Sequence, residues 1–161
     1  MSETCILTAA QMRWADQATI NSGTSGFSLM DRAGRAVASA VLGQMPDYGR
    51  VVIITGAGNN GGDGCAAAHY LKKHRIPVTI VSLVPVAELS GDSKAHAERA
   101  LEAGAKIREA CSDECISELS RWLLRAVIVV DAIFGTGLNR PLQGQMLDVI
   151  QRINQADRPV L

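Results

Sequence analysis

The sequence is poor in aromatic residues, carries no net charge and has no long apolar run. Aromatic side chains make up 4% of its 161 residues, and sixteen basic residues balance sixteen acidic ones. A neutral chain without interleaved basic and aromatic residues has no field that would recruit nucleic acid or an anionic membrane. No apolar stretch approaches the roughly 20 residues that cross a bilayer, and the first residues do not resemble a signal peptide. We expect a cytoplasmic protein that binds neither nucleic acid nor membrane.

Cysteine and the common catalytic signatures are scarce too. Four Cys in a chain of this length are typical of reduced thiols rather than of a disulfide framework. Cys111 and Cys115 lie about one helical turn apart, and no second pair of Cys or His completes a zinc-binding spacing. The sequence also lacks the Gly-x-Ser-x-Gly turn of esterases and the Gly-Lys-Ser/Thr loop of nucleotide triphosphatases.

The composition, 47% hydrophobic and 20% charged, predicts one globular domain over residues 1–161. Predicted helices cover residues 8–22, 28–43, 63–75, 91–103, 113–124 and 144–155, and predicted strands cover 51–55, 78–83 and 127–130, with a short extended segment at 105–109. The strands at 51–55 and 127–130 are rich in β-branched residues, as strands covered on both faces should be. We therefore predict an α/β fold, a three-layer α/β/α Rossmann-like sandwich with a mostly parallel sheet.

Signals at the ends of elements refine this outline. Thr8 and Gln11 match a capping box, and Ser28 with Asp31 resembles a second helix start. The last residues, Arg158-Pro-Val-Leu161, have the pattern of the beginning of another strand. Only three clear strands precede them, so we expect a fold truncated at its C-terminus, with some site residues missing.

A glycine-rich turn, Gly56-Ala-Gly-Asn-Asn-Gly-Gly-Asp-Gly64, follows the first strand. It contains G-x-G-x-x-G between a strand and a helix, the context in which backbone amides approach the diphosphate of a dinucleotide. That fingerprint also requires an acidic residue about 20 positions further on, to bind the ribose. The strand at 78–83 ends without one, and the next acid is Glu88, which argues against ordinary NAD binding.

Polar side chains inside this turn take the place of the missing acid. Asn59, Asn60 and Asp63 stand among glycines, where their oxygens can converge on a ligand or cation. Asx residues also favour turns, and Asp63 could simply cap its helix. Both interpretations of Asp63 stay open, whereas Asn60, one Asn more than a turn requires, favours ligand binding.

A second loop, Asp131-Ala-Ile-Phe-Gly-Thr-Gly-Leu-Asn-Arg-Pro141, leaves the strand at 127–130. Asp131 ends an apolar strand, and a carboxylate at a partly desolvated edge needs a partner such as a cation or a polar substrate. Gly135 and Gly137 allow positive φ or close backbone approach, and residues 139–141 could form a wall against phosphate or sugar. Loops at the carboxyl ends of parallel strands face one crevice, which predicts a small-molecule site. The alternative is a surface loop with a turn-forming Asp.

Other polar and aromatic side chains are expected to be structural. His69, His74 and His96 lie on predicted helices without a carboxylate at ligand spacing, so we expect surface residues or hydrogen-bonded helix residues. Trp14 and Trp122 lie on apolar helix faces and are predicted to be in the core.

The two loops together resemble the YjeF N-terminal domain family, the NAD(P)H-hydrate epimerases. The segment Ser28-Leu-Met-Asp-Arg-Ala-Gly34 is similar to that family's early helix, and the elements follow in order. The resemblance implies a Rossmann-like fold and interconversion of the R and S epimers of hydrated NADH and NADPH (NADHX and NADPHX, together NAD(P)HX). This isomerase activity repairs damaged cofactor for a partner ADP- or ATP-dependent dehydratase that accepts only one epimer. A homodimer is a further family expectation.

The same resemblance, carried over position by position, implies a substrate site and an ion site. Its substrate-binding residues would be Asn59, Asn60, Gly61, Gly62, Asp63, Gly135, Thr136, Gly137, Leu138, Asn139, Arg140 and Pro141. Asn60 and Asp131 would ligate a potassium ion. Asp63 and Asp131 are the carboxylates available for proton transfer. Similar domains also occur as non-catalytic scaffolds and as the amino half of bifunctional epimerase/dehydratases, but the intact Asn-Asn-Gly-Gly-Asp turn favours catalysis.

Overall fold

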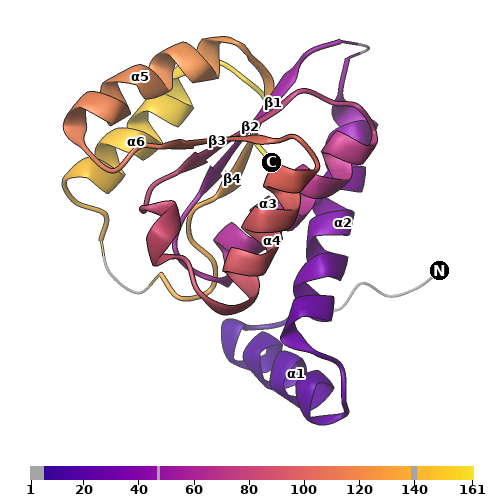
Figure 1. Cartoon of the computed structure of the whole chain (residues 1–161). Helices are drawn as coiled ribbons and strands as arrows, with labels where there is room; N and C mark the ends of the chain where they lie inside the picture. The colour runs from indigo at the N-terminus through magenta and orange to yellow at the C-terminus, as the bar shows by residue number, and fades with distance from the viewer. Residues whose placement is uncertain (1–5, 47, 139–140) are drawn as a thin grey trace.

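The computed structural model describes residues 6–46, 48–138 and 141–161. Two helices lead into an alternation of strands and helices (Figure 1). The elements are α1 (Ala9–Asn21), α2 (Gly26–Gln44), β1 (Arg50–Thr55), α3 (Asn59–Lys73), β2 (Val78–Ser82), the 3₁₀ turn η1 (Val86–Glu88), α4 (Gly91–Glu102), β3 (Lys106–Glu109), α5 (Asp113–Leu124), β4 (Ala126–Ala132) and α6 (Gln145–Gln155). Every predicted helix and strand is present, and the largest boundary error is the start of α3.

The four strands form one parallel sheet in the order β3-β2-β1-β4. β1 lies in the middle, where Ile53 pairs with Ile80 of β2 and with Val130 of β4. The predicted extended segment is the edge strand β3, whose Ile107 pairs with Ile80. The predicted α/β fold with a parallel sheet is therefore confirmed.

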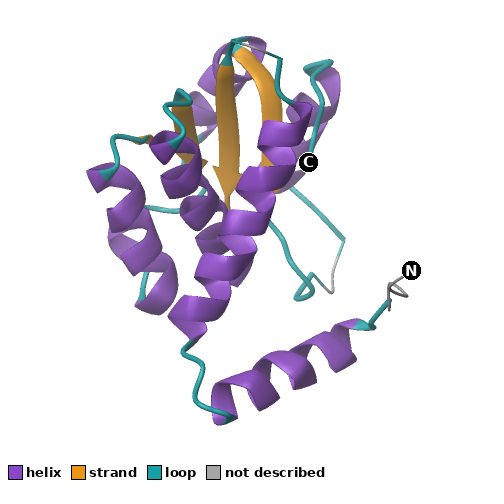
Figure 2. Cartoon of the chain, turned by 90° about the vertical axis from the view of Figure 1, so that its right-hand side faces the viewer, coloured by secondary structure: helices purple, strands orange, loops and turns teal. Residues whose placement is uncertain are grey.

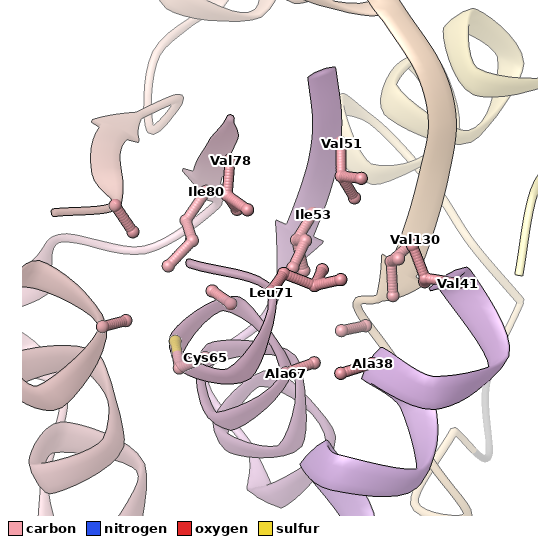
Figure 3. Close-up of a cluster of buried hydrophobic side chains, with 14 of the residues drawn as sticks. Ala38, Val41, Val51, Ile53, Cys65, Ala67, Leu71, Val78, Ile80 and Val130 are labelled. Atoms are coloured by element: carbon pink, nitrogen blue, oxygen red, sulfur yellow. The ribbon is translucent and has the colours of Figure 1, made fainter. Parts of the chain in front are cut away.

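Helices cover both faces of this sheet, and each face has its own apolar core. On one face Ile53 shares a core with Val41 of α2 and Leu71 of α3 (Figure 3). On the other face Ile54 shares a core with Leu119 of α5. Successive strand residues point to opposite faces, so a strand covered on both sides must be apolar throughout. This is why β1 is an unbroken run of β-branched side chains.

The last residues extend the sheet beside β4, as their pattern predicts. Val160 forms a parallel bridge with Val129. The backbone N–H of Val129 donates to the carbonyl of Pro159 at 2.9 Å, and the N–H of Leu161 donates to the carbonyl of Val129 at 3.0 Å. The N–H of Asp131 in turn donates to the carbonyl of Leu161 at 2.9 Å. These residues occupy the position of a fifth strand.

Side-chain caps fix the starts of the first two helices. At α1 the predicted capping box is confirmed, because Gln11 N donates to Thr8 Oγ1 at 3.3 Å and Thr8 N donates to Gln11 Oε1 at 2.8 Å. α2 begins at Gly26, and its cap is Ser25, whose hydroxyl oxygen accepts from the N–H of Ser28 at 3.1 Å. The predicted cap at Ser28 is wrong, because Ser25 supplies the same chemistry three residues earlier.

The first helix lies outside the sandwich, beyond the carboxyl ends of the strands (Figure 2). None of its residues is buried, and Trp14 is 75% exposed, so the prediction of Trp14 in the core is wrong. Trp122, by contrast, packs against the core under α5 and α6. Residues 22–25 connect α1 to α2, with Gly23 at a φ of +103° that suits glycine. No helix in the described residues is long and apolar enough to cross a membrane.

Candidate functional site

A cleft of about 900 Å³ opens at the carboxyl ends of β1, β2 and β4. Its walls come from both glycine-containing loops, the segment after β2, and the helices α1, α3 and α6. The lining residues are Met12, Arg13, Asp16, Gly56, Ala57, Gly58, Asn59, Asn60, Asp63, Leu83, Val84, Ile133, Phe134, Gly135, Thr136, Gly137, Leu138 and Met146. The two loops thus face one cleft, as expected for loops that leave neighbouring parallel strands.

The first loop is shorter than the sequence suggests, because α3 already begins at Asn59. Gly58 is the N-cap residue, and no side chain caps the helix. The predicted start at residue 63 is wrong, and so is the interpretation of Asp63 as an N-cap. Asn and Gly are weak helix formers, which hid the first turn of α3 from the sequence pattern. The uncapped first turn lines the cleft, and the free backbone N–H groups at a helix start suit an anionic group.

Two glycines of this turn, Gly61 and Gly62, allow close packing within the chain. A Cβ on Gly61 would lie 2.1 Å from the carbonyl oxygen of Gly56, and a Cβ on Gly62 would lie 2.4 Å from the sulfur of Met30. Gly61 and Gly62 are both buried and do not line the cleft, although both were expected to contact substrate. Gly58, in contrast, lines the cleft, and a Cβ there would meet open space.

Asn60 joins the two loops. Its side-chain Nδ2 donates to the backbone carbonyl of Phe134 at 2.9 Å. Gly135 follows directly, and a Cβ on it would lie 3.4 Å from the Cβ of Asn60. That distance is an ordinary van der Waals contact, and a Cβ on Gly137 would meet open space, so neither glycine is required for close backbone approach. Neither has positive φ.

Asp63 is a partly buried carboxyl in the wall of the cleft. Burial raises the pKa of Asp63 to about 6, and the negative charge of Asp16 adds to the increase. A carboxyl that titrates near neutrality can both give and take a proton at working pH. Its position and its pKa make Asp63 the best-placed acid/base group in the cleft.

Asp131 has a different environment from the one predicted. Its side chain is exposed rather than partly desolvated, and its Oδ1 accepts from the N–H of Ile133 at 3.0 Å. It does not belong to the residues that line the cleft. The sequence pattern missed this: Asp131 lies inside β4, one residue before its end, and its side chain points to the opposite face of the sheet from Val130 and is exposed to solvent.

The end of the second loop extends the site. Thr136 and Leu138 line the cleft, whereas Asn139 and Arg140 lie outside the described residues. Pro141 lines a smaller hollow of about 320 Å³ that shares Phe134 and Leu138 with the main cleft. The second loop therefore contributes a largely apolar wall.

Sequence reasoning missed several of the lining residues. Met12, Arg13 and Asp16 of α1 face the cleft, as do Leu83 and Val84 after β2. Leu83 and Val84 could have been anticipated, since they leave the carboxyl end of a strand beside β1. Nothing in the periodicity of α1 indicates that this helix turns back toward the loops.

The residues expected to bind potassium offer suitable oxygens. The amide nitrogen of Asn60 is engaged with Phe134, so its Oδ1 is the acceptor that remains, and Asp131 has Oδ2 in addition to the Oδ1 that binds Ile133. Carboxylate and amide oxygens are the ligands that hard cations prefer. The chemistry of this donor set fits an alkali cation. In the described part of the chain, no three His, Cys, Asp or Glu side chains gather into a metal-binding group.

The histidines lie outside the cleft, as predicted. His96 is fully buried, with Nε2 3.2 Å from the carbonyl oxygen of Phe27, and His69 has Nδ1 3.2 Å from the carbonyl oxygen of Arg99. Arg99 also pairs with Asp31 at 2.7 Å. Burial lowers the pKa of both His69 and His96, so both rings are neutral at pH 7. His74 is exposed at the end of α3.

The chain resembles curated proteins along nearly its whole length. It is 39% identical to the NAD(P)H-hydrate epimerase of Limosilactobacillus fermentum, over 96% of this chain and 71% of that protein. It is 36% identical to the NAD(P)H-hydrate epimerase of Rhodobacter capsulatus, over 97% of this chain and 73% of that protein. A bifunctional NAD(P)H-hydrate repair enzyme, Nnr, of Thermanaerovibrio acidaminovorans is 37% identical over 88% of this chain, which spans only 27% of that protein.

The fold and the family model agree with these matches. The crystal structure of the yeast protein YNL200c superposes with a TM-score of 0.83 at 21% identity, covering 98% of this chain and 68% of that one. Residues 26–161 match the family model described as YjeF-related protein N-terminus. Because that match covers most of the sequence, and relatives above 30% identity extend over nearly all of it, the chain belongs to the YjeF-related N-terminal family.

Proposed function

We propose that the protein is an NAD(P)H-hydrate epimerase, which interconverts the R and S epimers of NADHX and NADPHX. One observation carries the proposal: Asp63, a carboxyl with a pKa raised to about 6, lies in the wall of a cleft formed by the two loops. Epimerisation of a hydrate requires a group that can protonate a hydroxyl and accept the proton back. The relatives named NAD(P)H-hydrate epimerase support the same assignment.

The chemistry needs only one proton carrier. The carboxyl of Asp63 donates its proton to the hydroxyl on carbon 6 of the reduced ring, the carbon–oxygen bond breaks and water leaves. The lone pair of the ring nitrogen then forms an iminium cation. Water adds to the opposite face of carbon 6, the electron pair returns to nitrogen, and the released proton returns to the carboxylate of Asp63. The site starts and ends in the same protonation state.

The shape of the cleft supports this role. The uncapped start of α3 offers backbone N–H groups to the diphosphate of the substrate. Phe134 and Leu138 give the other wall an apolar surface for the planar rings. With Asn59 and Thr136 as neighbouring polar contacts, the loops would hold carbon 6 next to Asp63.

Asn60 and Asp131 would hold a potassium ion with their side-chain oxygens. A bound cation supplies a fixed positive charge that orients the negatively charged substrate. Asn60 also keeps the two loops together through Phe134, so the ion and the loop contact are coupled through one side chain. Asp131 is assigned to the ion rather than to proton transfer, because it does not line the cleft.

The substrate implies a partner reaction. Both epimers arise from damaged cofactor, and a dehydratase that accepts one epimer needs the other to be converted. A bifunctional NAD(P)H-hydrate repair enzyme among the relatives is consistent with that link. An ADP- or ATP-dependent dehydratase is therefore the proposed pathway partner, and self-association into a homodimer remains a prediction.

A coupled assay tests the proposal. Mixed NADHX epimers are incubated with a stereospecific dehydratase, with and without the protein. An epimerase accelerates consumption of the epimer that the dehydratase rejects, well above its spontaneous conversion. A binding or scaffold module of the same fold leaves that slow phase unchanged, and this result would overturn the proposal.

A further inference from the structure

The first helix has side chains in the cleft although it packs into no core. None of the residues of α1 is buried, yet Met12, Arg13 and Asp16 line the same cleft as Asp63. Positions 12, 13 and 16 fall on one side of a helix. Trp14 projects elsewhere and is exposed. The contribution of α1 within the described structure is therefore to the cleft rather than to an apolar core.

Charge in the described part of the cleft is confined to the helices. Its charged lining residues are Arg13 and Asp16 on α1 and Asp63 on α3, whereas the loops after β1, β2 and β4 line it with uncharged residues. α2 and α4 also pack on α3, and Asp31 of α2 pairs with Arg99 of α4 at 2.7 Å, but no charged residue of these two helices lines the cleft. Asp16 is the acid that lines the cleft with Asp63, and its negative charge adds to the effect of burial on Asp63.

We propose that α1 forms a third wall of the substrate site, in which Asp16 is the positioning partner of Asp63 and acts on it through its negative charge. This inference rests on the proposed epimerase function. Asp63 is partly buried and Asp16 lines the same cleft, so the negative charge of Asp16 favours the protonated form of Asp63. The proton is then retained on Asp63, the more buried of the two, where it faces the hydroxyl of the substrate.

The second carboxylate also suits the intermediate. When Asp63 gives up its proton, a positive charge develops on the ring, and the negative charge of Asp16 stabilises it from the wall that α1 forms. Arg13, three residues earlier on the same helix face, offsets part of the negative charge of the pair. Asp16 contributes through charge and does not transfer the proton itself.

The direct test is the titration of the Asp63 side chain, followed by NMR on its carboxyl carbon in the full chain without substrate. In the wild type we expect a midpoint near the pKa of about 6. In Asp16→Asn the midpoint falls by at least about half a pH unit, because the repulsive charge is gone. Asp16→Glu restores it in part. Two control variants leave the midpoint unchanged. Gln17→Ala lies on the same helix outside the cleft lining, and Glu102→Gln removes a charge at the end of α4.

Kinetics separates a charge effect from a structural one. The protonated form of Asp63 starts the reaction, so kcat/KM falls as pH rises through its pKa, and in Asp16→Asn this fall moves to lower pH. The expected loss is about 3-fold or more at pH 7.5, with little loss below pH 5. An equal loss at every pH, with the Asp63 midpoint unchanged, overturns the inference while leaving the epimerase intact. A shifted midpoint in a protein without epimerase activity overturns the proposed function, and with it the catalytic part of the inference.

Discussion

Asn60 on α3 donates its side-chain amide to the carbonyl of Phe134 in the loop after β4, at 2.9 Å. The two residues are far apart in the sequence, and this bond fixes one wall of the cleft against the other. The sites proposed for the substrate and for the ion both depend on that placement.

Removal of this bond should loosen the second loop. Asn60→Ala leaves the carbonyl of Phe134 without its donor, and we expect a loss of about 1 kcal/mol in the free energy of unfolding. Faster amide exchange at residues 134–138 should accompany it. Urea unfolding and hydrogen exchange measure the two effects. Asn59→Ala, at an exposed neighbouring position, is the matched control. Equal stability of the two variants would contradict the structural role of Asn60.

Gly61 is predicted to be far less tolerant than Gly58. A Cβ on Gly61 would lie 2.1 Å from a backbone oxygen of Gly56, which no side-chain rotation can relieve, whereas a Cβ on Gly58 meets open space. We expect Gly61→Ala to cost about 2 kcal/mol or more and Gly58→Ala less than about 1 kcal/mol. Chemical denaturation of both variants checks this, and comparable losses would show that the turn is not packed as described.

Asp63 should make stability depend on pH. Its pKa is raised from 3.8 to about 6, so the folded protein binds this proton more tightly than the unfolded chain. The stabilisation is fully present below about pH 4 and is lost as pH rises through about 6. Asp63→Asn stays neutral, so its melting temperature should exceed that of the wild type by about 1–3 °C at pH 8, a small shift because solvent screens a partly exposed group.

Calorimetry at pH 4 and pH 8 gives the comparison for this residue. The advantage of Asp63→Asn should disappear at the lower pH, where the wild-type carboxyl is protonated. A gain of the same size at both pH values would mean that the pKa of Asp63 is not raised.

The ion site predicts a difference between potassium and sodium. In the wild type, replacement of sodium by potassium at constant ionic strength should raise both the epimerisation rate and the melting temperature. Asp131→Asn keeps an acceptor for the N–H of Ile133 but loses the charge, so we expect the potassium effect on the rate to fall about 10-fold. Asp148→Asn, an acid on α6 paired with Arg152, is the control. Full potassium dependence in Asp131→Asn would remove Asp131 from the ion site.

The sandwich itself could be predicted because its signals are local. The β-branched runs around Ile53 and Val130 fix buried parallel strands, and the alternation with amphipathic helices then leaves few topologies. Even the extended segment at the chain end follows from pattern, since Val160 pairs with Val129. These are cases in which local preference and tertiary packing agree.

The site was less predictable because tertiary packing overrides local preference there. Asn59 and Gly61 disfavour helix, yet both belong to the first turn of α3. Gly61 packs so closely against Gly56 that only glycine fits at this position, so its identity reflects packing rather than helix preference. The exposure of Trp14 and the position of Asp16 depend on the direction of α1, which no periodicity encodes. The sequence identified the two loops and Asp63, but not the helix that faces them.

The most direct test of the account uses one purified epimer of NADHX and no dehydratase. The appearance of the second epimer is followed by NMR with wild-type protein, with Asp63→Asn and without protein. We predict that the wild type brings the epimers to equilibrium far faster than the blank, and that Asp63→Asn loses about 100-fold or more of that acceleration. Equal acceleration by the two proteins would contradict the role of Asp63, and no acceleration by the wild type would contradict the proposed function.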